Sequence, residues 1–418
     1  MQSLIVLGRQ PAIGIAELES LYGGDKISLI GDQAVAVDVD PCLLAFDRLG
    51  GAVKFAKLLT ELGSVNWQDI TKFLLSTGPD KSKGMPGGKM YLGISSYGFK
   101  VSAKQVQSLA FSLKKAIKSA TNRSVRIIPN NETALNSAQI IHGQLTKQHG
   151  WELLLIKHGN KTVIAQTIKV QDINAYARRD QKRPARDAKV GMLPPKLAQI
   201  IINLSVGLLP EEARQSVCEA PENKPPAKLH FKGKTLLDPF CGTGVVLQEA
   251  AIMGYDCIGS DINERMVKYA KANLSWLKSL PISPLNPKSK VTILRADATT
   301  QQWPTKPDFI ASETYLGRPL SASDKSSPDL ESTVIECDKL IRGFLDNLLP
   351  QIKKDSRICL AIPAWKVKGE QCVHLPLIDS LGVIGYNRVS FVHAGDEQLI
   401  YYRPNQQVAR ELLVLTKR

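Results

Sequence analysis

The 418-residue sequence has no apolar run near the roughly 18 residues that a membrane-spanning helix needs, so no membrane partner is expected. Its seven cysteines include no Cys-x-x-Cys pair, and its six histidines show no metal-ligand spacing, which argues against a bound metal. Unpaired cysteines are typical of a reducing compartment, so a cytoplasmic location is expected. The first residues carry no basic leader before their apolar segment, which argues against secretion.

Acidic residues are missing from one long stretch. No Asp or Glu occurs between Asp80 and Glu132, while ten Lys and Arg residues fall there. Residues 1–200 hold 27 Lys and Arg against 15 Asp and Glu, so they carry most of the net charge of +15. A solvated basic face would explain a short lysine run, but a window of this length predicts contact with a polyanion such as nucleic acid.

The stretch from Lys234 to Ile252 predicts a buried strand, a glycine turn and a helix. The strand ends at Asp238, and the turn contains Gly242 and Gly244. Two glycines let the backbone turn tightly and approach a ligand, and the first turn of the helix offers unpaired N–H groups. The pattern therefore predicts a cofactor site at the edge of a doubly wound sheet.

A second carboxylate supports this interpretation. Asp261 ends the next predicted strand, 23 positions after Asp238, where an acid can accept hydrogen bonds from both hydroxyls of a ribose. The third glycine of the dinucleotide-binding fingerprint is absent, because Gly244 is followed by Val-Val-Leu. A glycine turn in an ordinary α/β domain is the alternative, and the distal acid argues against it.

The front of the chain alternates strands and helices. Residues 1–65 predict a small α/β unit with a helix at 15–22 and another at 41–49. A helix is expected at 102–120, with its apolar residues on one face and its lysines among the polar positions. Later elements include a helix at 137–148 and two strands joined at Gly159-Asn160.

Three segments resemble known families. Asp-Pro-Phe-Cys-Gly-Thr-Gly at 238–244 resembles the cofactor loop of class I methyltransferases. The front region resembles a ferredoxin-like domain followed by a THUMP domain, an RNA-binding module. Arg-Asp-x-x-Arg-Pro at 179–184, running into Gly-Met-Leu-Pro-Pro-Lys-Leu-Ala at 191–198, resembles the THUMP-containing tRNA guanine-N2-methyltransferases that modify guanosine 10.

The resemblance implies an α/β protein with a Rossmann-like methyltransferase domain, built on a mostly parallel seven-stranded sheet. Its implied domains are a ferredoxin-like domain at 1–65, a THUMP domain at 66–171, a linker at 172–193 and the methyltransferase domain at 194–418. S-adenosyl-L-methionine is the implied cofactor and tRNA the implied partner. The reaction would transfer a methyl group to the N2 amine of guanosine, with guanosine 10 as the expected position. A helper subunit stays open.

The resemblance also assigns residues to the cofactor and to RNA. Asp261 would hold the ribose and Asp297 the adenine, unless Asp297 only caps a helix. The expected cofactor residues are Asp238, Pro239, Phe240, Gly242, Gly244, Asp261, Ile262, Asp297 and Ala298. The expected RNA-binding residues are Lys100, Lys104, Lys114, Lys115, Lys118, Arg123, Arg126, Arg178 and Arg179. The linker arginines are equally expected to form salt bridges between domains.

The predicted acceptor motif departs from the family. Related amino-methyltransferases carry Asp/Asn-Pro-Pro-Tyr/Phe after the fourth strand, whereas this chain has Ser312-Glu313-Thr314-Tyr315. Glu313, Thr314 and Tyr315 are the candidate catalytic residues: Glu313 would accept a hydrogen bond from the amine, and Tyr315 would stack on the base. Asp396, Arg403 and Arg410 near the C-terminal hairpin are expected to form structural salt bridges.

Loss of both prolines keeps two other interpretations open. One is a methyltransferase that acts on another base, such as a ribosomal RNA guanine or a DNA adenine, although DNA adenine enzymes lack the basic front region. The other is an RNA-binding protein whose methyltransferase domain is inactive.

Overall fold

The computed structural model describes residues 3–187, 192–209, 231, 233–280, 285–286, 288–318, 328–366, 372–403 and 406–418. Their contacts define two compact units. Unit 1 consists of Met1–Pro11, Asp25–Asp47 and Ala52–Asn174. Unit 2 consists of Ala12–Gly24, Arg48–Gly51 and Ala175–Arg418. No helix in the described ranges is long and apolar enough to cross a membrane, and no group of acidic, His and Cys side chains within them could hold a metal ion.

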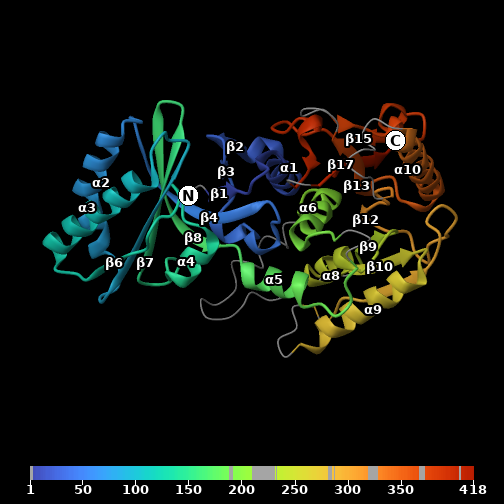
Figure 1. Cartoon of the computed structure of the whole chain (residues 1–418), viewed down its shortest axis with the longest axis horizontal. Helices are drawn as coiled ribbons and strands as arrows, with labels where there is room; N and C mark the ends of the chain where they lie inside the picture. The colour runs from blue at the N-terminus through green and yellow to red at the C-terminus, as the bar shows by residue number, and fades with distance from the viewer. Residues whose placement is uncertain are drawn as a thin grey trace. The chain divides into compact units, whose positions relative to one another are not determined.

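Unit 1 is built on an eight-stranded sheet in the order β2-β3-β1-β4-β8-β7-β5-β6 (Figure 1). Neighbouring strands are antiparallel except that β5 runs parallel to both β6 and β7. The strands are β1 (Ser3–Leu7), β2 (Ile27–Ile30), β3 (Ala34–Val37), β4 (Ala52–Leu62), β5 (Met90–Tyr97), β6 (Val125–Ile127), β7 (Gly150–His158) and β8 (Lys161–Val170).

Two long helices and one short one belong to unit 1: α2 (Trp67–Lys83), α3 (Ala103–Thr121) and α4 (Ser137–His142). Helix α3 confirms its prediction: Ser102 and Gln105 form a capping box, and the face with Val106, Leu109, Leu113 and Ile117 is buried. The sequence pattern does not predict α2, because Gly78 and Pro79 interrupt it. A Cβ at Gly78 would lie 2.5 Å from Leu113 Cδ1, so the glycine lets α2 and α3 pack closely.

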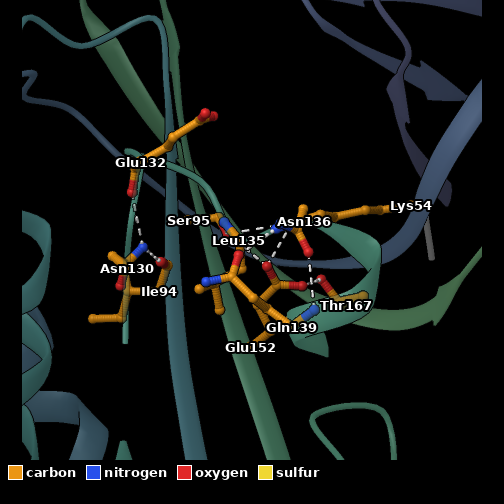
Figure 2. Close-up of polar contacts among 10 residues, drawn as sticks. All are labelled: Lys54, Ile94, Ser95, Asn130, Glu132, Leu135, Asn136, Gln139, Glu152 and Thr167. Atoms are coloured by element: carbon orange, nitrogen blue, oxygen red, sulfur yellow. Dashed lines mark hydrogen bonds and ion pairs between the residues drawn. The ribbon is translucent and has the colours of Figure 1, made fainter. Parts of the chain in front are cut away.

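Four strands of unit 1 share a buried polar cluster (Figure 2). Lys54 on β4 donates to Glu152 on β7 over 2.5 Å and to Ser95 on β5 over 3.2 Å. The other Glu152 oxygen accepts from Thr167 on β8, and Ser95 also accepts from the N–H of Leu135. Burial lowers the pKa of Lys54, but the attraction and hydrogen bonds of Glu152 and Tyr97 together exceed this effect, so the pKa is raised. The Lys54–Glu152 cluster is thus a fully paired ionic centre inside the sheet.

Unit 2 is built on a sheet whose main path is β11-β10-β9-β12-β13-β17-β15. Strands β11, β10, β9, β12 and β13 on this path are parallel, and β17 is antiparallel to β13, so the predicted mostly parallel sheet is confirmed. Seven strands follow the main path as predicted, but β14 and β16 pair beside it, so the described sheet has nine strands. The strands are β9 (Thr235–Asp238), β10 (Asp256–Asp261), β11 (Val291–Arg295), β12 (Phe309–Glu313), β13 (Arg357–Lys366), β14 (Cys372–Val373), β15 (Tyr386–Arg388), β16 (Ile400–Tyr401) and β17 (Val408–Lys417).

The order of this sheet reverses at β9, which lies between β10 and β12. Ligands bind beyond the carboxyl ends of strands at such a switch point. By the pairing registers, Gly259 lies level with Asp238 on one side and Ile310 lies level with Leu237 on the other. Asp261 and Glu313 therefore each lie two residues beyond the level of Asp238, on the strands that flank β9.

The described helices of unit 2 are α1 (Pro11–Tyr22), α5 (Ile173–Gln181), α6 (Pro195–Val206), α8 (Val245–Ile252), α9 (Glu264–Ser279) and α10 (Pro328–Leu348). The buried Glu17 of α1 accepts from the N–H groups of Gly50 and Gly51 and from Asn203 of α6. Residues 12–24 and 48–51 therefore pack within unit 2, although sequence periodicity alone groups them with residues 1–65.

Three local predictions are wrong. The helix expected at 41–49 is two short 3₁₀ turns, Pro41–Leu43 and Phe46–Arg48. The helix expected at 137–148 ends at His142, because Gly143 begins a turn there. The sequence predicts a strand of the C-terminal hairpin at 391–393, but these residues are not a strand, and β15 and β16 pair with β17 instead. The sequence also predicts an exposed connection at 211–228 and a polar, serine-rich loop at 321–332. That connection, most of that loop and Gly191 of the family segment at 191–198 lie outside the described residues.

Candidate functional site

The glycine bend between β9 and α8 uses its two glycines differently. Gly244 has a φ of +84°, and a Cβ there would lie 3.0 Å from the Cβ of Ala270 on α9, so it permits helix packing. Gly242 has a φ of +50°, and a Cβ there would meet nothing within 4 Å. Open space thus adjoins Gly242, where a ligand can approach the backbone.

Backbone bonds hold the bend against β10. The N–H of Cys241 donates to the carbonyl of Ser260 over 2.8 Å, and the Ser260 hydroxyl donates to the carbonyl of Pro239 over 3.1 Å. The Phe240 ring packs edge-on against Phe344 of α10, with centroids 5.2 Å apart. Pro239 and Phe240 therefore shape the bend by packing.

Asp261 faces the bend. Its carboxylate accepts from the N–H of Gly242 over 2.9 Å and from the N–H of Asn263 over 2.8 Å. Burial raises its pKa, and the two backbone hydrogen bonds oppose that shift. The next residue, Ile262, is 65% exposed and so offers an uncovered apolar side chain beside the carboxylate.

Asp238 links the bend to the acceptor motif. The Ser312 hydroxyl on β12 donates to Asp238 Oδ1 over 2.6 Å. Burial raises the pKa of Asp238 to about 8, although the bonds from Ser312 and from the N–H of Phe240 partly oppose it. Asp238 is therefore mostly protonated at neutral pH.

Asp297 caps the turn that follows β11, which is the alternative that sequence reasoning left open. Its Oδ1 accepts from the N–H of Thr299 over 2.9 Å and from the Thr299 hydroxyl over 2.7 Å. Ala298 is buried, and its carbonyl accepts from Asn347 on α10. The cofactor roles of Asp297 and Ala298 stay predictions.

The three candidate catalytic residues follow β12 but differ in what holds them. Glu313 Oε1 accepts from Arg410 Nε on β17 over 2.6 Å. Thr314 is buried, and both its N–H and its hydroxyl donate to the carbonyl of Ala361. Its side chain therefore bonds the neighbouring strand β13. Tyr315 is 37% exposed and can present its ring to a base.

Polar residues predicted near the C-terminal hairpin have specific partners. Arg410 pairs with Glu313, Asp396 pairs with Arg388 over 3.1 Å, and Arg403 donates to the Tyr401 hydroxyl over 3.3 Å. The expectation of structural salt bridges is confirmed for Asp396. The contact between Arg410 and a candidate catalytic residue was not foreseen, because β-strand pairing cannot be read from sequence distance.

The segment after α5 lies beside the glycine bend. Asn273 on α9 bonds both the N–H and the carbonyl of Ala185, and it also donates to the carbonyl of Thr243 over 2.9 Å. Asp187 pairs with Arg265 over 2.8 Å. Sequence reasoning missed Asn273, whose only signal is a polar residue on the buried side of a helix.

Two of the arginines predicted to bind RNA have partners within the protein. Arg179 is buried, and its guanidinium bonds both oxygens of Glu249 on α8 over 2.7 and 3.1 Å, as the salt-bridge alternative expected. Arg123 is half-buried and donates to backbone carbonyls of Ser82, Met85, Pro86 and Gly88, whereas Arg178 is exposed. RNA binding by Arg123 and Arg178 stays a prediction.

The remaining basic residues form a face of unit 1 that is centred on α3. Within the described ranges, no ion pair involves Lys100, Lys104, Lys114, Lys115, Lys118 or Arg126. Lys104, Phe111, Lys115 and Lys118 are seven, four and three residues apart, which places them on one side of the helix. Phe111 is 48% exposed, and its apolar position among lysines was a signal that sequence reasoning missed.

Comparisons with known proteins agree with this architecture. Residues 230–280 match the family model described as UPF0020, an RMKL-like methyltransferase domain. The tRNA (guanine(10)-N2)-dimethyltransferase of Methanothermobacter thermautotrophicus is 29% identical over 175 residues, which are 42% of this chain and 40% of that protein. The Pyrococcus abyssi protein of the same name is 33% identical over 84 residues, which are 20% and 18% of the two chains.

Among solved structures, TrmN from Thermus thermophilus aligns over 100% of both chains, with 16% identity and a TM-score of 0.49. The similarity in sequence spans less than half of the length of the curated relatives.

The sheet order, the glycine bend and the facing acid define a class I methyltransferase domain, the class that uses S-adenosyl-L-methionine. Within that class, the chain is a distant relative of the tRNA (guanine(10)-N2)-dimethyltransferases.

Proposed function

We propose that this protein transfers a methyl group from S-adenosyl-L-methionine to the N2 amine of a guanosine in tRNA, with guanosine 10 as the target. The observation that carries the proposal is the Asp261 carboxylate, which faces the open side of the Gly242 bend. Glu313 and Tyr315 follow the strand on the other side of β9, so a cofactor pocket and an acceptor motif share one edge of the sheet.

The residues at the bend fit the cofactor. Asp261 uses each carboxylate oxygen for one backbone N–H, and each oxygen keeps a lone pair for a ribose hydroxyl. Ile262 supplies an apolar surface for the adenine ring, and Asp297 supplies an acceptor for its amine. When bound, the cofactor supplies an electrophilic methyl group.

The main task of the acceptor motif is to orient the amine. A strong base is not needed, because the amine protons become acidic as the nitrogen bonds to the transferred methyl carbon. Glu313 would accept one N–H of the amine while Tyr315 stacks on the ring. A carboxylate accepts hydrogen bonds only. The guanine N2 amine has the donor N1–H as its neighbour, whereas the adenine amine has the acceptor N1. The adenine amine offers the same N–H, so the carboxylate favours guanine where it also accepts the N1–H.

The basic face of unit 1 would hold the tRNA. Its lysines lack carboxylate partners among the described residues and can neutralise phosphates, and Phe111 offers a ring for stacking on an unpaired base. The printed names of the relatives support tRNA as the substrate.

The test is methylation of unmodified tRNA by the full chain, followed by mass spectrometry of nucleosides. N2-methylguanosine is expected with wild type, and it should be absent for Glu313→Ala and for a tRNA that carries adenosine at position 10. Asp355→Ala is the matched control, because Asp355 is exposed and precedes the opposite end of β13. Methylation of another nucleoside would defeat the guanosine proposal.

Calorimetry separates an inactive domain from an active one. Wild type should bind S-adenosyl-L-methionine, and Asp261→Ala should weaken binding by roughly 10- to 100-fold, the size expected for lost hydrogen bonds to a charged group. Cofactor binding without any methylated product would favour the RNA-binding interpretation. No cofactor binding at all would contradict the role given to the glycine bend.

A further inference from the structure

The side chain of Glu313 has more conformational freedom than the Asp of the related Asp-Pro-Pro motif would have. Glu313 has one more rotatable bond than an Asp would, and the residues after it, Thr314 and Tyr315, lack the fixed φ of proline. A carboxylate that must orient an amine has to be held within a narrow range of positions. Another group therefore has to restrict Glu313.

Arg410 is placed to do this. Its side chain is 4% exposed, and its Nε donates to Glu313 Oε1 over 2.6 Å. Its Nη1 donates to Gln406 over 3.1 Å, which fixes the other end of the guanidinium. Glu313 pairs with Ala361 on β13, and Arg410 pairs with Pro363 on the same strand, so the contact crosses β13 from β17 to β12.

The pair is closed on one side only. The Glu313 side chain is 16% exposed, and Arg410 bonds Oε1. Two further carboxyl groups, Asp238 and Asp261, lie at the same edge of the sheet, and, beside burial, repulsion from Asp261 and Glu313 contributes to the raised pKa of Asp238. A partly buried carboxylate that lost its cationic partner would turn toward solvent or take up a proton.

We propose that Arg410 is a positioning residue for the acceptor base: it fixes Glu313 through Oε1 and leaves Oε2 to accept an N–H of the guanine amine. This inference rests on the proposed function. It gives β17, which lies between β13 and β15, a part in the reaction through Glu313 and without contact to the base.

A double-mutant cycle tests the inference. Single-turnover methylation of tRNA is measured at saturating cofactor and tRNA for Arg410→Met, Glu313→Gln and the double variant. Arg410→Met should lower the rate by roughly 10- to 100-fold, as expected when a reacting group is misplaced by about 1 Å. The double variant should be no slower than Glu313→Gln, because Arg410 acts through Glu313.

Three controls exclude a merely structural effect. The affinity of Arg410→Met for S-adenosyl-L-methionine should equal that of wild type, since the hydrogen-bond partners of Arg410, Glu313 and Gln406, are not residues of the glycine bend. Arg410→Lys keeps the charge and should retain more of the rate; it also replaces Arg410→Met if that variant fails to fold. Arg388→Met is the matched control, because Arg388 pairs with Asp396 and Glu411 and not with the acceptor motif.

The outcomes are distinct. A wild-type rate for Arg410→Met, or losses that multiply in the double variant, would overturn the role of Arg410 and leave the proposed function standing. A full rate for Glu313→Gln would overturn the roles of both Glu313 and Arg410 and leave the methyl transfer standing, whereas no N2-methylguanosine from wild type would overturn the proposed function itself.

Discussion

Each unit of this protein contains a buried ion pair inside its sheet, and the two pairs differ in how completely they are satisfied. In unit 1, both oxygens of Glu152 are bonded by protein groups, and Lys54 bonds Glu152 and Ser95 (Figure 2). In unit 2, Arg410 bonds one oxygen of Glu313, and the Glu313 side chain keeps some exposure. The first pair is thus closed, and the second is open at Glu313 Oε2, which Arg410 does not bond.

This difference distinguishes a pair that stabilises the fold from a pair that can also bind a ligand. A closed pair is high in cost to break, since loss of either partner leaves a buried charge alone. An open pair holds a charged group in place while leaving part of its hydrogen-bonding capacity for a ligand. Thus the Lys54–Glu152 cluster would serve folding, and the Arg410–Glu313 pair would serve the acceptor site.

The largest effect is expected from breaking the closed pair. Glu152→Ala leaves Lys54 buried without its partner and should destabilise unit 1 by about 3–5 kcal/mol. Hydrogen exchange of the amides of β5 and β7, measured on the full chain, should accelerate accordingly. Lys54→Met combined with Glu152→Leu should recover much of the loss. Unchanged exchange in Glu152→Ala would show that the cluster is not important for stability.

Changing Glu313 in the open pair should lower the methylation rate and leave the stability of the fold nearly unchanged. Glu313→Asp shortens the side chain by one methylene, so the carboxylate cannot keep both its bond to Arg410 and its reach to the base. The single-turnover rate should fall by roughly 10- to 100-fold, while the melting temperature changes little. A rate equal to wild type would mean that the extra methylene of Glu313 has no function.

Asp238 is an intermediate case, since it is buried with a hydroxyl partner, Ser312, and no cation. Its folded pKa of about 8 lies above the ordinary value, so the stability that it contributes is present below about pH 4 and is lost as pH rises toward 8. Between pH 6 and 8.5, wild type should lose roughly 2 kcal/mol more stability than Asp238→Asn. Glu17, whose pKa burial raises to about 7, is present in both proteins and cancels. Parallel pH profiles would contradict the assignment.

The smallest effects are expected for the lysines of α3, which form no ion pair among the described residues. Lys115→Ala and Lys118→Ala should each weaken tRNA binding by a few-fold and lower the salt dependence by about one released counterion. Phe111→Ala should weaken binding without changing the salt dependence, because stacking is not an ionic contact. Lys72→Ala, on α2, is the control. Equal salt slopes for wild type and the lysine variants would remove α3 from the RNA interface.

The sequence was informative where function depends on local order. The strand, the bend with Gly242 and Gly244, and the acid at Asp261 could be predicted because they are close in the chain and their spacing follows from strand–helix geometry. The basic window was equally visible, since charge is a property of composition. Helix α2 could not be predicted, because Gly78 is needed for close packing against Leu113 of α3, and no pattern of neighbouring residues indicates that contact.

The sequence by itself therefore determined the class of sheet, the place of the cofactor bend and the sign of the charge on the front region, all of which depend on residue type and short spacing. Only the tertiary structure decided which charged side chains form ion pairs within the protein. Arg179 pairs with Glu249, and Arg410 pairs with Glu313. The reason is physical: these pairs join residues 70 and 97 positions apart, and they meet only through helix packing between α5 and α8 and through the strand register of β12, β13 and β17.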